Sequence, residues 1–363
     1  MKLRHPARLA LALLSGWLFA TSSPAAESGK PARLFARADS AEWSITLSGP
    51  WREIRRHVKK DARYPARLTY PGADGVPQTI SVEVSPRGLT RRLEVCSFPP
   101  LKVHFNKQET KNTAWRGNGS LKLVTYCRTN QKYSQYYIKE FLAYRIYNLI
   151  TPFSFRVKPL MVEYVDDEKK SRTLTRFGFL IEDIDDVAQR LDLKDLHIGK
   201  VAVMQLDPLE TARFALFQYM ISNLDWSALS GPDPNRCCHN SRLIGKSETA
   251  VPKYAIPYDF DFSGLVNAPY AGPPEGIRVR NVRQRLYRGF CADNDRLPQA
   301  VADLNQKRRA IMALINDNPH LDKRARQSAL DYLQAFYEII NDPDQFERQI
   351  TGKCRGQAAE REP

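Results

Sequence analysis

Residues 66–84 read ARLTYPGADGVPQTISVEV and carry the pattern that decides the fold class. Apolar and polar side chains alternate in Ala66–Tyr70 and again in Thr79–Val84, and the Pro71–Gly75 segment between them consists largely of turn-forming residues. Because successive side chains of a strand point to opposite faces of a sheet, this alternation predicts two half-buried strands joined by a turn. The first half of the chain is therefore expected to be built around a β-sheet.

The strand pattern continues on both sides of this segment. Alternating residues begin near Trp43, and later runs predict four more strands, at Leu101–Phe105, Leu121–Tyr126, Val157–Val165 and Thr173–Ile181. A helix is expected from Tyr133 to Ile150, because aromatic and aliphatic residues recur there at helical spacing.

The second half of the chain is expected to be mainly helical. Asp207 and Pro208 form a good helix start, because the aspartate caps free backbone N–H groups and the proline fits the first turn. This helix is expected to end at about Ser222. The later elements are expected in the order strand, strand, helix, helix, at 242–244, 253–257, 297–316 and 323–340.

This order of elements predicts an α+β fold with two lobes and a ligand-binding cleft between them. The N-lobe is expected at 41–195, with a mixed β-sheet and one helix. The C-lobe is expected at 196–355 and is mainly helical. Residues 26–40 are interpreted as a flexible lead-in and residues 356–363 as a disordered tail.

The first 25 residues have the organisation of a secretory signal peptide. The basic residues Lys2, Arg4 and Arg8 precede an apolar run, Leu9–Ala20, and small residues lead to an expected cleavage site near Ala25. A retained membrane anchor is the alternative, but the apolar run is shorter than the roughly 20 residues that span a bilayer. We therefore expect a periplasmic or secreted chain with no transmembrane segment after cleavage.

The charge of the chain points to anionic partners. The formal net charge is +15, and removal of the expected signal peptide takes away only three basic residues. In an exported protein this excess favours phosphorylated ligands, acidic proteins or envelope polysaccharides. Nucleic acid is not expected, because no stripe of alternating basic and aromatic residues is present. The oligomeric state is left open.

Six cysteines in an exported chain predict three disulfide bonds. The expected pairs are Cys96–Cys127, with Cys237 and Cys238 bonded separately to the remaining two, Cys291 and Cys354. Metal binding is the competing interpretation, but the Cys237-Cys238-His239 cluster does not supply a tetrahedral ligand set by itself.

Two charged residues stand out in the first half of the chain. Lys122 lies inside the apolar run 121–124, where it either faces solvent or points its ammonium group toward bound phosphates. Glu140 lies in the following helix, either as a solvated surface acid or as a salt-bridge partner that fixes this lysine.

Acidic and amide side chains stand out in the second half. Asp225 follows a very apolar helix, where it is either a turn residue or a group poised for proton acceptance. Asn240 offers a neutral oxygen ligand for a hard cation. Asp259 and Asp261 follow a short strand and point to one side if the chain stays extended, which suits Mg²⁺; a solvated turn is the alternative.

The order of these residues predicts phosphoryl transfer. A strand lysine that grips phosphates, a helix glutamate, a proton-accepting aspartate, an asparagine and a strand-end aspartate occur in this order in protein kinases. Hydrolase chemistry based on serine is not supported, because no G-x-S-x-G segment is present.

Four stretches resemble the spore coat protein H (CotH) family, whose members have an atypical protein-kinase fold. They are Pro86–Arg91 with the strand that follows, Leu121–Leu123, Phe179–Glu182, and Asn223–Asp225 with Tyr258–Asp261. The resemblance implies a two-lobed protein-kinase-like fold that uses ATP with Mg²⁺ or Mn²⁺. It would assign Lys122 to the nucleotide phosphates, Asp225 to the catalytic base, and Asn240 and Asp259 to the metal. Glu140 is preferred over Glu182 as the partner of the lysine.

The chain departs from the kinase pattern in several places. Asp225 and Asn240 are separated by 14 residues, where protein kinases have about four. Gly88 is the only glycine near the expected phosphate-covering turn, so Arg87 and Arg91 are expected to bind phosphate directly, unless they are solvated residues of the turn.

The sequence thus predicts an exported kinase-like phosphotransferase that moves the γ-phosphate of ATP to a hydroxyl group on a protein or cell-envelope acceptor. The alternatives are a catalytically inactive kinase-like module that binds an anionic ligand or partner, and nucleotidyl transfer in place of phosphoryl transfer.

Overall fold

The computed structural model describes residues 33–37, 41–72, 74–168 and 173–356. The expected signal peptide and residues 357–363 of the expected tail lie outside the described residues. Part of the expected lead-in is described and packs against the protein: Leu34 and Phe35 are buried, and the backbone N–H of Leu34 donates to the carbonyl of Ala114 at 3.2 Å.

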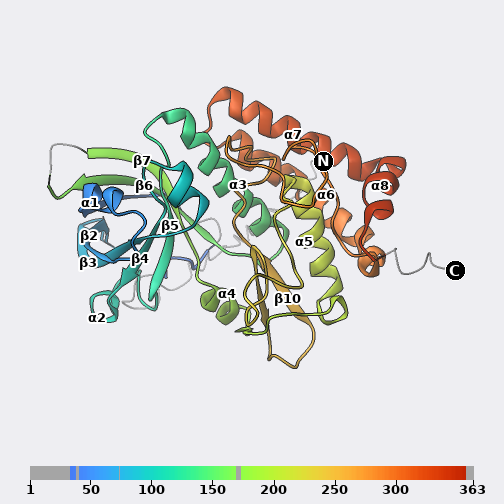
Figure 1. The fold of residues 1–363 in the computed structure, drawn as a ribbon, viewed down its shortest axis with the longest axis horizontal. Helices are drawn as coiled ribbons and strands as arrows, with labels where there is room; N and C mark the ends of the chain where they lie inside the picture. The colour runs from blue at the N-terminus through green and yellow to red at the C-terminus, as the bar shows by residue number, and fades with distance from the viewer. Residues whose placement is uncertain (1–32, 38–40, 73, 169–172, 357–363) are drawn as a thin grey trace, which may run out of the picture. The chain divides into compact units, whose positions relative to one another are not determined.

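Seven strands of the first half form a closed barrel in the order β1-β2-β3-β4-β5-β7-β6 (Figure 1). They are β1 (Trp43–Gly49), β2 (Tyr64–Pro71), β3 (Pro77–Pro86), β4 (Leu101–Phe105), β5 (Ser120–Val124), β6 (Val157–Asp166) and β7 (Thr173–Ile181). Neighbouring strands are antiparallel except β1 and β6, which pair in parallel from Trp43 opposite Leu160 to Gly49 opposite Asp166. This last pairing closes the barrel.

The closed barrel overturns the prediction of a two-lobed protein-kinase-like fold with a mixed-sheet N-lobe. Alternation in the sequence identifies strands. Closure of the barrel, however, depends on the pairing of β1 with β6, whose paired residues are more than a hundred positions apart in the chain. Closing the sheet gives both β1 and β6 a second hydrogen-bonded neighbour and so removes exposed strand edges. The result is a barrel-type fold with helices and a small second sheet.

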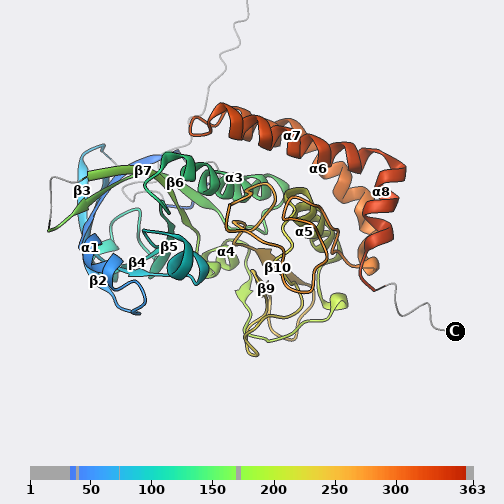
Figure 2. The same cartoon turned by 45° about the horizontal axis from the view of Figure 1, so that its top comes forward.

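The small sheet has the order β10-β9-β8 and lies in the second half of the chain (Figure 2). Its strands are β8 (Lys194–Asp195), β9 (Ser241–Gly245) and β10 (Lys253–Pro257). The β9–β10 hairpin matters for function because β10 leads directly into the Tyr258–Asp261 segment.

Eight α-helices are found in the described residues, and the four long ones were predicted. They are α1 (Trp51–Arg56), α2 (Lys107–Thr110), α3 (Ser134–Ile150), α4 (Ile184–Arg190), α5 (Pro208–Ile221), α6 (Leu297–Asn316), α7 (Lys323–Asn341) and α8 (Pro343–Gln349). The predicted start of α5 is confirmed, because Asp207 Oδ1 accepts the backbone N–H of Glu210 at 2.9 Å. None of the described helices combines the length and apolar composition needed to cross a membrane.

Helix α3 lies between the barrel and the helices of the second half (Figure 1). It packs on β6 and β7 on one side and on α5 and α6 on the other. The ring of Phe141 contacts Phe177 of β7, and the ring of Tyr147 lies 4.5 Å from Phe217 of α5. Because neighbours cover this helix on several sides, its polar residue Glu140 is buried.

Three disulfides connect the six cysteines, which fits an oxidising environment. The predicted Cys96–Cys127 bond is confirmed. The other predicted pairs are wrong, because Cys237 bonds to its neighbour Cys238, and Cys291 bonds to Cys354. The backbone N–H of Cys291 donates to the carbonyl of Arg355, so the C-terminal segment brings Cys354 to Cys291 and leaves the adjacent cysteines to each other.

Candidate active site

Three carboxylates meet where α3 approaches the segment after β10. Glu140 comes from α3, and Asp259 and Asp261 follow β10; ligand oxygens of the three lie within 4.8 Å of one another. Glu140 and Asp261 are buried, whereas the side chain of Asp259 is 43% exposed. Of these three described carboxylates, Asp259 is the one exposed to solvent.

Arg91 partly neutralises these three carboxylates. Its Nη1 and Nη2 donate to the two carboxylate oxygens of Glu140 at 2.8 and 3.1 Å. Its Nε lies 3.2 Å from Asp261 Oδ2, and its Nη2 lies 3.5 Å from Asp259 Oδ1. We call Arg91, Glu140, Asp259 and Asp261 the Arg91 cluster. It holds three carboxylates and one guanidinium, so its negative charge is in excess.

The backbone around Arg91 is shaped by a glycine and a disulfide. Gly88 has φ +83°, a conformation that side chains disfavour, and it turns the chain after β3. Arg91 then begins a short π-helical turn, Arg91–Val95, and the next residue, Cys96, is bonded to Cys127. The arginine is thus tethered on the side where its turn ends.

Burial perturbs the protonation of the Arg91 cluster. It raises the pKa of Asp261 to about 7, with Arg91 opposing and Asp259 adding to the rise. Burial likewise raises the pKa of Glu140 against the attraction of Arg91. Because both shifts come from removing negative charge from water, a bound cation would reverse them.

The chain is not extended at Asp259, contrary to the geometry assumed from sequence. Asp259 has φ +63°, and its backbone N–H donates to the hydroxyl oxygen of Tyr144 on α3 at 2.9 Å. The turn that follows still brings Asp261 into the Arg91 cluster, where its Oδ2 accepts the hydroxyl of Tyr270 at 3.1 Å. The two aspartates therefore meet through a left-handed turn, a conformation that Asp tolerates better than most residues.

Lys122 projects from β5 toward the same segment. Its Nζ lies 4.6 Å from the centroid of the Tyr258 ring. Burial, followed by the charge of Arg87, lowers the pKa of Lys122 to about 8. The side chain remains in contact with solvent although protein atoms surround it closely. The carboxylate of Glu140 binds Arg91, so the expected pairing of Glu140 with Lys122 is replaced by a pairing with arginine.

Asp225 and Asn240 meet despite the long segment between them. Nδ2 of Asn240 donates to the backbone carbonyl of Asp225 at 2.8 Å and to its Oδ2 at 3.0 Å. His239 Nε2 lies 2.6 Å from Asp225 Oδ1, so both carboxylate oxygens are hydrogen-bonded. The backbone N–H of Ser227 donates to the carbonyl of His239 at 3.0 Å, which holds the loop that brings Asn240 back.

The predicted residues are joined by one continuous set of contacts. The backbone N–H of Tyr258 donates to the carbonyl of Asn240 at 3.0 Å. The ammonium group of Lys122 lies over the ring of Tyr258. Asp259 is the next residue in the chain. Lys122, Asp225, Asn240 and the Arg91 cluster therefore lie around Tyr258.

Three residues of the site were missed or passed over in the sequence. His239 adjoins Asn240, and its position next to a candidate ligand is the signal that points to it. Tyr144 lies one helical turn after Glu140 and so shares its face of α3. Tyr258 precedes Asp259 at the end of β10, but its role beneath Lys122 depends on a contact between distant segments.

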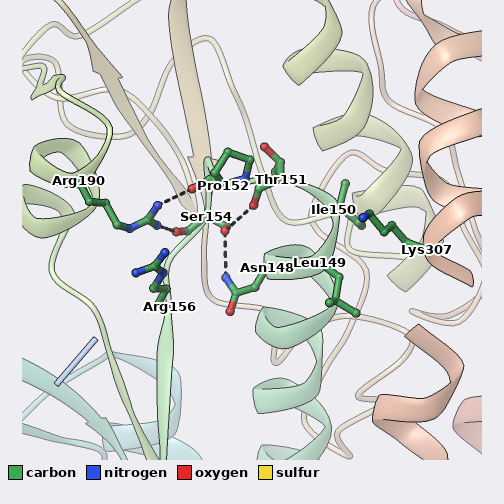
Figure 3. Close-up of a pocket in the computed structure, with 9 residues that line it drawn as sticks. All are labelled: Asn148, Leu149, Ile150, Thr151, Pro152, Ser154, Arg156, Arg190 and Lys307. Atoms are coloured by element: carbon green, nitrogen blue, oxygen red, sulfur yellow. Dashed lines mark hydrogen bonds between the residues drawn. The ribbon is translucent and has the colours of Figure 1, made fainter. Parts of the chain in front are cut away.

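Glu182 lies elsewhere and binds Arg190, which lines a pocket of about 350 Å³ (Figure 3). Arg190 donates from Nε to Glu182 Oε1 at 3.1 Å, from Nη1 to the carbonyl of Pro152 at 2.7 Å, and from Nη2 to the carbonyl of Ser154. Glu182 Oε2 also accepts the backbone N–H of Arg156 at 2.8 Å. We call this arrangement of Arg190, Glu182 and the two carbonyls the Arg190 clamp; it ties α4 to the segment after α3.

The carboxylates of the Arg91 cluster fit a hard divalent cation. Mg²⁺ and Mn²⁺ prefer oxygen ligands, and the cluster already surrounds one positive group. Lys122 and Arg87 lie close enough for their charges to act on each other, which suits the phosphates that accompany such a cation. No protein-family model and no curated protein matches this chain.

Proposed function

We propose that this chain is an exported, metal-dependent phosphotransferase that moves the γ-phosphate of ATP to a hydroxyl group of a protein or cell-envelope acceptor. The observation that carries the proposal is the grouping around Tyr258 of the Arg91 cluster, Lys122 and the hydrogen-bonded Asp225. Carboxylates for a cation, cations for phosphate and a carboxylate for a proton are the parts that phosphoryl transfer requires.

Each group has one task. Asp259, Asp261 and Glu140 would hold Mg²⁺ or Mn²⁺ with the oxygen of Asn240, and the cation would offset negative charge on the phosphates. Lys122 and Arg87 bind phosphate oxygens. Asp225 accepts the proton of the acceptor hydroxyl, whose oxygen forms the new bond to phosphorus while the bond from phosphorus to the leaving diphosphate oxygen breaks.

His239 and Asn240 position Asp225 in this scheme. Their hydrogen bonds engage both oxygens of the Asp225 carboxylate, which fixes its orientation toward an incoming hydroxyl group. A fixed base avoids the loss of rotational freedom at the moment of reaction.

The leader pattern of the sequence and the disulfides support the proposed export. The basic, apolar and small-residue order of the first 25 residues favours cleavage and export, and three disulfides suit a periplasmic or secreted protein. The resemblance to the spore coat protein H family supports the same chemistry through its short motifs.

A second candidate function is an inactive module that binds an anionic ligand. The observation that favours it is Arg91 itself, which contacts all three carboxylates and so supplies internally the charge that a metal would bring. In such a module Lys122 and Arg87 retain the ligand, and no phosphate is transferred.

Titration of the mature chain with Mn²⁺ and ATP by calorimetry tests the proposal. Asp259→Asn keeps a residue that tolerates φ +63° and removes one carboxylate charge, so we expect at least about tenfold weaker Mn²⁺-dependent ATP binding with an unchanged fold. Asp192→Asn is the control, because Asp192 is an exposed acid paired with Lys246.

Mass spectrometry separates the two candidates. Incubation with ATP and Mn²⁺ is expected to add a phosphate to an acceptor or to the chain itself, and to lose that addition in Asp225→Asn. Metal-dependent ATP binding without any added phosphate would favour the inactive module. Equal ATP binding by wild type and Asp259→Asn would remove the Arg91 cluster from ligand binding.

A further inference from the structure

Two arginines outside the Arg91 cluster share one buried carboxylate. Nη2 of Arg236 donates to Asp195 Oδ2 at 2.7 Å, and Nη2 of Arg242 donates to the same oxygen. His197 Nε2 lies 3.3 Å from it. The side chain of Asp195 is only 4% exposed. Because one carboxylate faces two permanent positive charges, the group as a whole is positive.

Arg242 lies on the β9–β10 hairpin, whose two strands lie side by side in Figure 2. Arg242 of β9 lies opposite Ile256 of β10. Two residues further along each strand, in the direction of the site, come Asn240 and Tyr258, which are joined by a backbone hydrogen bond of 3.0 Å. Arg242 is therefore two residues away in the chain from Asn240, which contacts both Asp225 and Tyr258.

The charges of both arginines act on residues of the site. Burial and Asp259 raise the pKa of Tyr258, and Arg242 and Arg236 oppose this rise. Arg242 also adds to the effects of burial and Arg87 that lower the pKa of Lys122. Positive charge from separate segments thus gathers around the ring of Tyr258.

The arginines have hydrogen-bonding capacity that the described protein does not use. Each is hydrogen-bonded to Asp195 through Nη2, and the side chain of Arg236 is 38% exposed. A guanidinium has five N–H donors, so the N–H groups of Arg236 that reach solvent can bind the oxygen atoms of an anionic ligand.

The loop that carries Arg236 is held in place. The backbone N–H of Cys237 donates to the carbonyl of Ile198 at 2.7 Å, and that of Cys238 donates to the carbonyl of Ser241 at 3.1 Å. The backbone on the C-terminal side of Arg236 is therefore anchored, and Asp195 holds its side chain through Nη2, so less entropy is lost on binding.

We propose that Arg236 and Arg242, held by Asp195, form a second anion-binding subsite next to Lys122, which rests on the phosphotransferase function proposed above. The ligand of the site then carries two separated anionic groups, one at the Arg91 cluster with Lys122 and Arg87, and one at the arginine pair. An extended phosphoester or polyphosphate has this chemistry, whereas a compact diphosphate reaches only the first position.

Inorganic polyphosphates of increasing length test the subsite, because a flexible chain needs no assumed spacing. The mature wild-type chain with Mn²⁺ is titrated by calorimetry with pyrophosphate and with a chain of roughly ten phosphates. The long chain is expected to bind at least about tenfold more tightly, from charge-assisted hydrogen bonds to the arginines. Arg236→Gln with Arg242→Gln should abolish this advantage and change pyrophosphate binding far less, because the charge of Arg242 acts on Lys122 only from a distance.

The control is a double variant that removes the same amount of positive charge from exposed positions away from the arginine pair. Arg63→Gln with Arg67→Gln removes two exposed cations of the barrel, with side chains 60% and 59% exposed. It should keep the advantage of the long chain; an equal loss in both double variants would mean non-specific attraction and overturn the subsite. Arg236→Gln alone, which leaves Arg242 on Asp195, is used if the double variant unfolds and should lose part of the advantage.

The outcomes for the subsite and for the proposed function differ. Pyrophosphate binding that depends on Asp259, without any advantage of the long chain, would overturn the subsite and leave the function standing. Binding of the long chain that depends on the arginines, without pyrophosphate binding, would support the subsite and contradict the function. Failure of both ligands to bind would overturn both.

Discussion

The Arg91 cluster and the Arg190 clamp are both buried groups of arginine and carboxylate, but their charge balance differs. In the clamp one guanidinium meets one carboxylate, and its remaining N–H groups donate to the carbonyls of Pro152 and Ser154. In the cluster one guanidinium meets three carboxylates. A balanced, hydrogen-bonded pair joins segments of the chain, whereas an excess of buried carboxylates is relieved by a proton or by a bound cation.

The two regions also differ in their access to solvent. Asp259 is partly exposed and gives the Arg91 cluster a route for a cation. The pocket beside the Arg190 clamp is open, but its guanidinium is committed to protein acceptors (Figure 3). A structural ion pair therefore differs from a candidate ligand site in its charge balance and in its access to solvent.

The largest expected effect comes from breaking the Arg190 clamp. Arg190→Leu leaves Glu182 buried without its partner and should lower the free energy of unfolding by about 3–5 kcal/mol. Urea unfolding measures this loss, with Arg63→Leu as the exposed control. The folded fraction should bind Mn²⁺ as wild type does. A loss below about 1 kcal/mol would mean that the clamp contributes little and that the contrast between the regions is wrong.

A smaller effect is expected from the pH dependence of the Arg91 cluster. The folded-state pKa of Asp261 is raised to about 7, above its value in an unfolded chain, so the folded protein without metal loses stability as pH rises through 7. A cation needs the carboxylate form, so Mn²⁺ affinity should rise about tenfold between pH 6 and pH 8.

Calorimetry with Mn²⁺ at several pH values measures this change. Asp261→Asn has no titrating group at this position and should bind Mn²⁺ weakly with a flatter profile. A wild-type affinity that is constant from pH 6 to pH 8 would contradict the assignment of Asp261 as a ligand. Urea unfolding of both chains without metal checks the sign, because wild type should lose more stability than Asp261→Asn on going from pH 6 to pH 8, while Glu140 is the same in both.

The smallest effect is expected at Lys307, which lines the pocket beside the Arg190 clamp (Figure 3). Lys307→Met keeps the length of the side chain and removes its charge, so the free energy of unfolding should change by less than about 0.5 kcal/mol. Thermal and urea unfolding measure it beside Arg190→Leu. A loss as large as that of Arg190→Leu would show that charge in the pocket, rather than hydrogen bonding in the clamp, stabilises this region.

Local patterns predicted the elements but not their closure. The Thr173–Ile181 strand and the helix from 297 to 316 agree with the structure because periodicity and turn residues act over a few positions. The short helices α1, α2, α4 and α8 were missed, since one or two turns give little periodic signal. The β1–β6 pairing, which closes the barrel, leaves no local trace.

The sequence predicted which residues belong to the candidate site better than it predicted the contacts between them. The positions of Lys122, Glu140, Asp225, Asn240 and Asp259 were noted from residue type and order, and they lie around Tyr258. Which acid binds which base was not predictable. Glu140 binds Arg91, and Glu182 binds Arg190, because distances between remote segments decide ion pairs.

By itself the sequence determined the strands, the long helices, the leader pattern, the basic charge and a set of residues suited to phosphate and metal. Only the tertiary structure decided the closed barrel, the disulfide partners of Cys237 and Cys291, and the placement of Arg91 among three carboxylates. The physical reason is range: propensity and periodicity act between neighbours along the chain, whereas pairing, burial and charge balance depend on which distant segments share one interior.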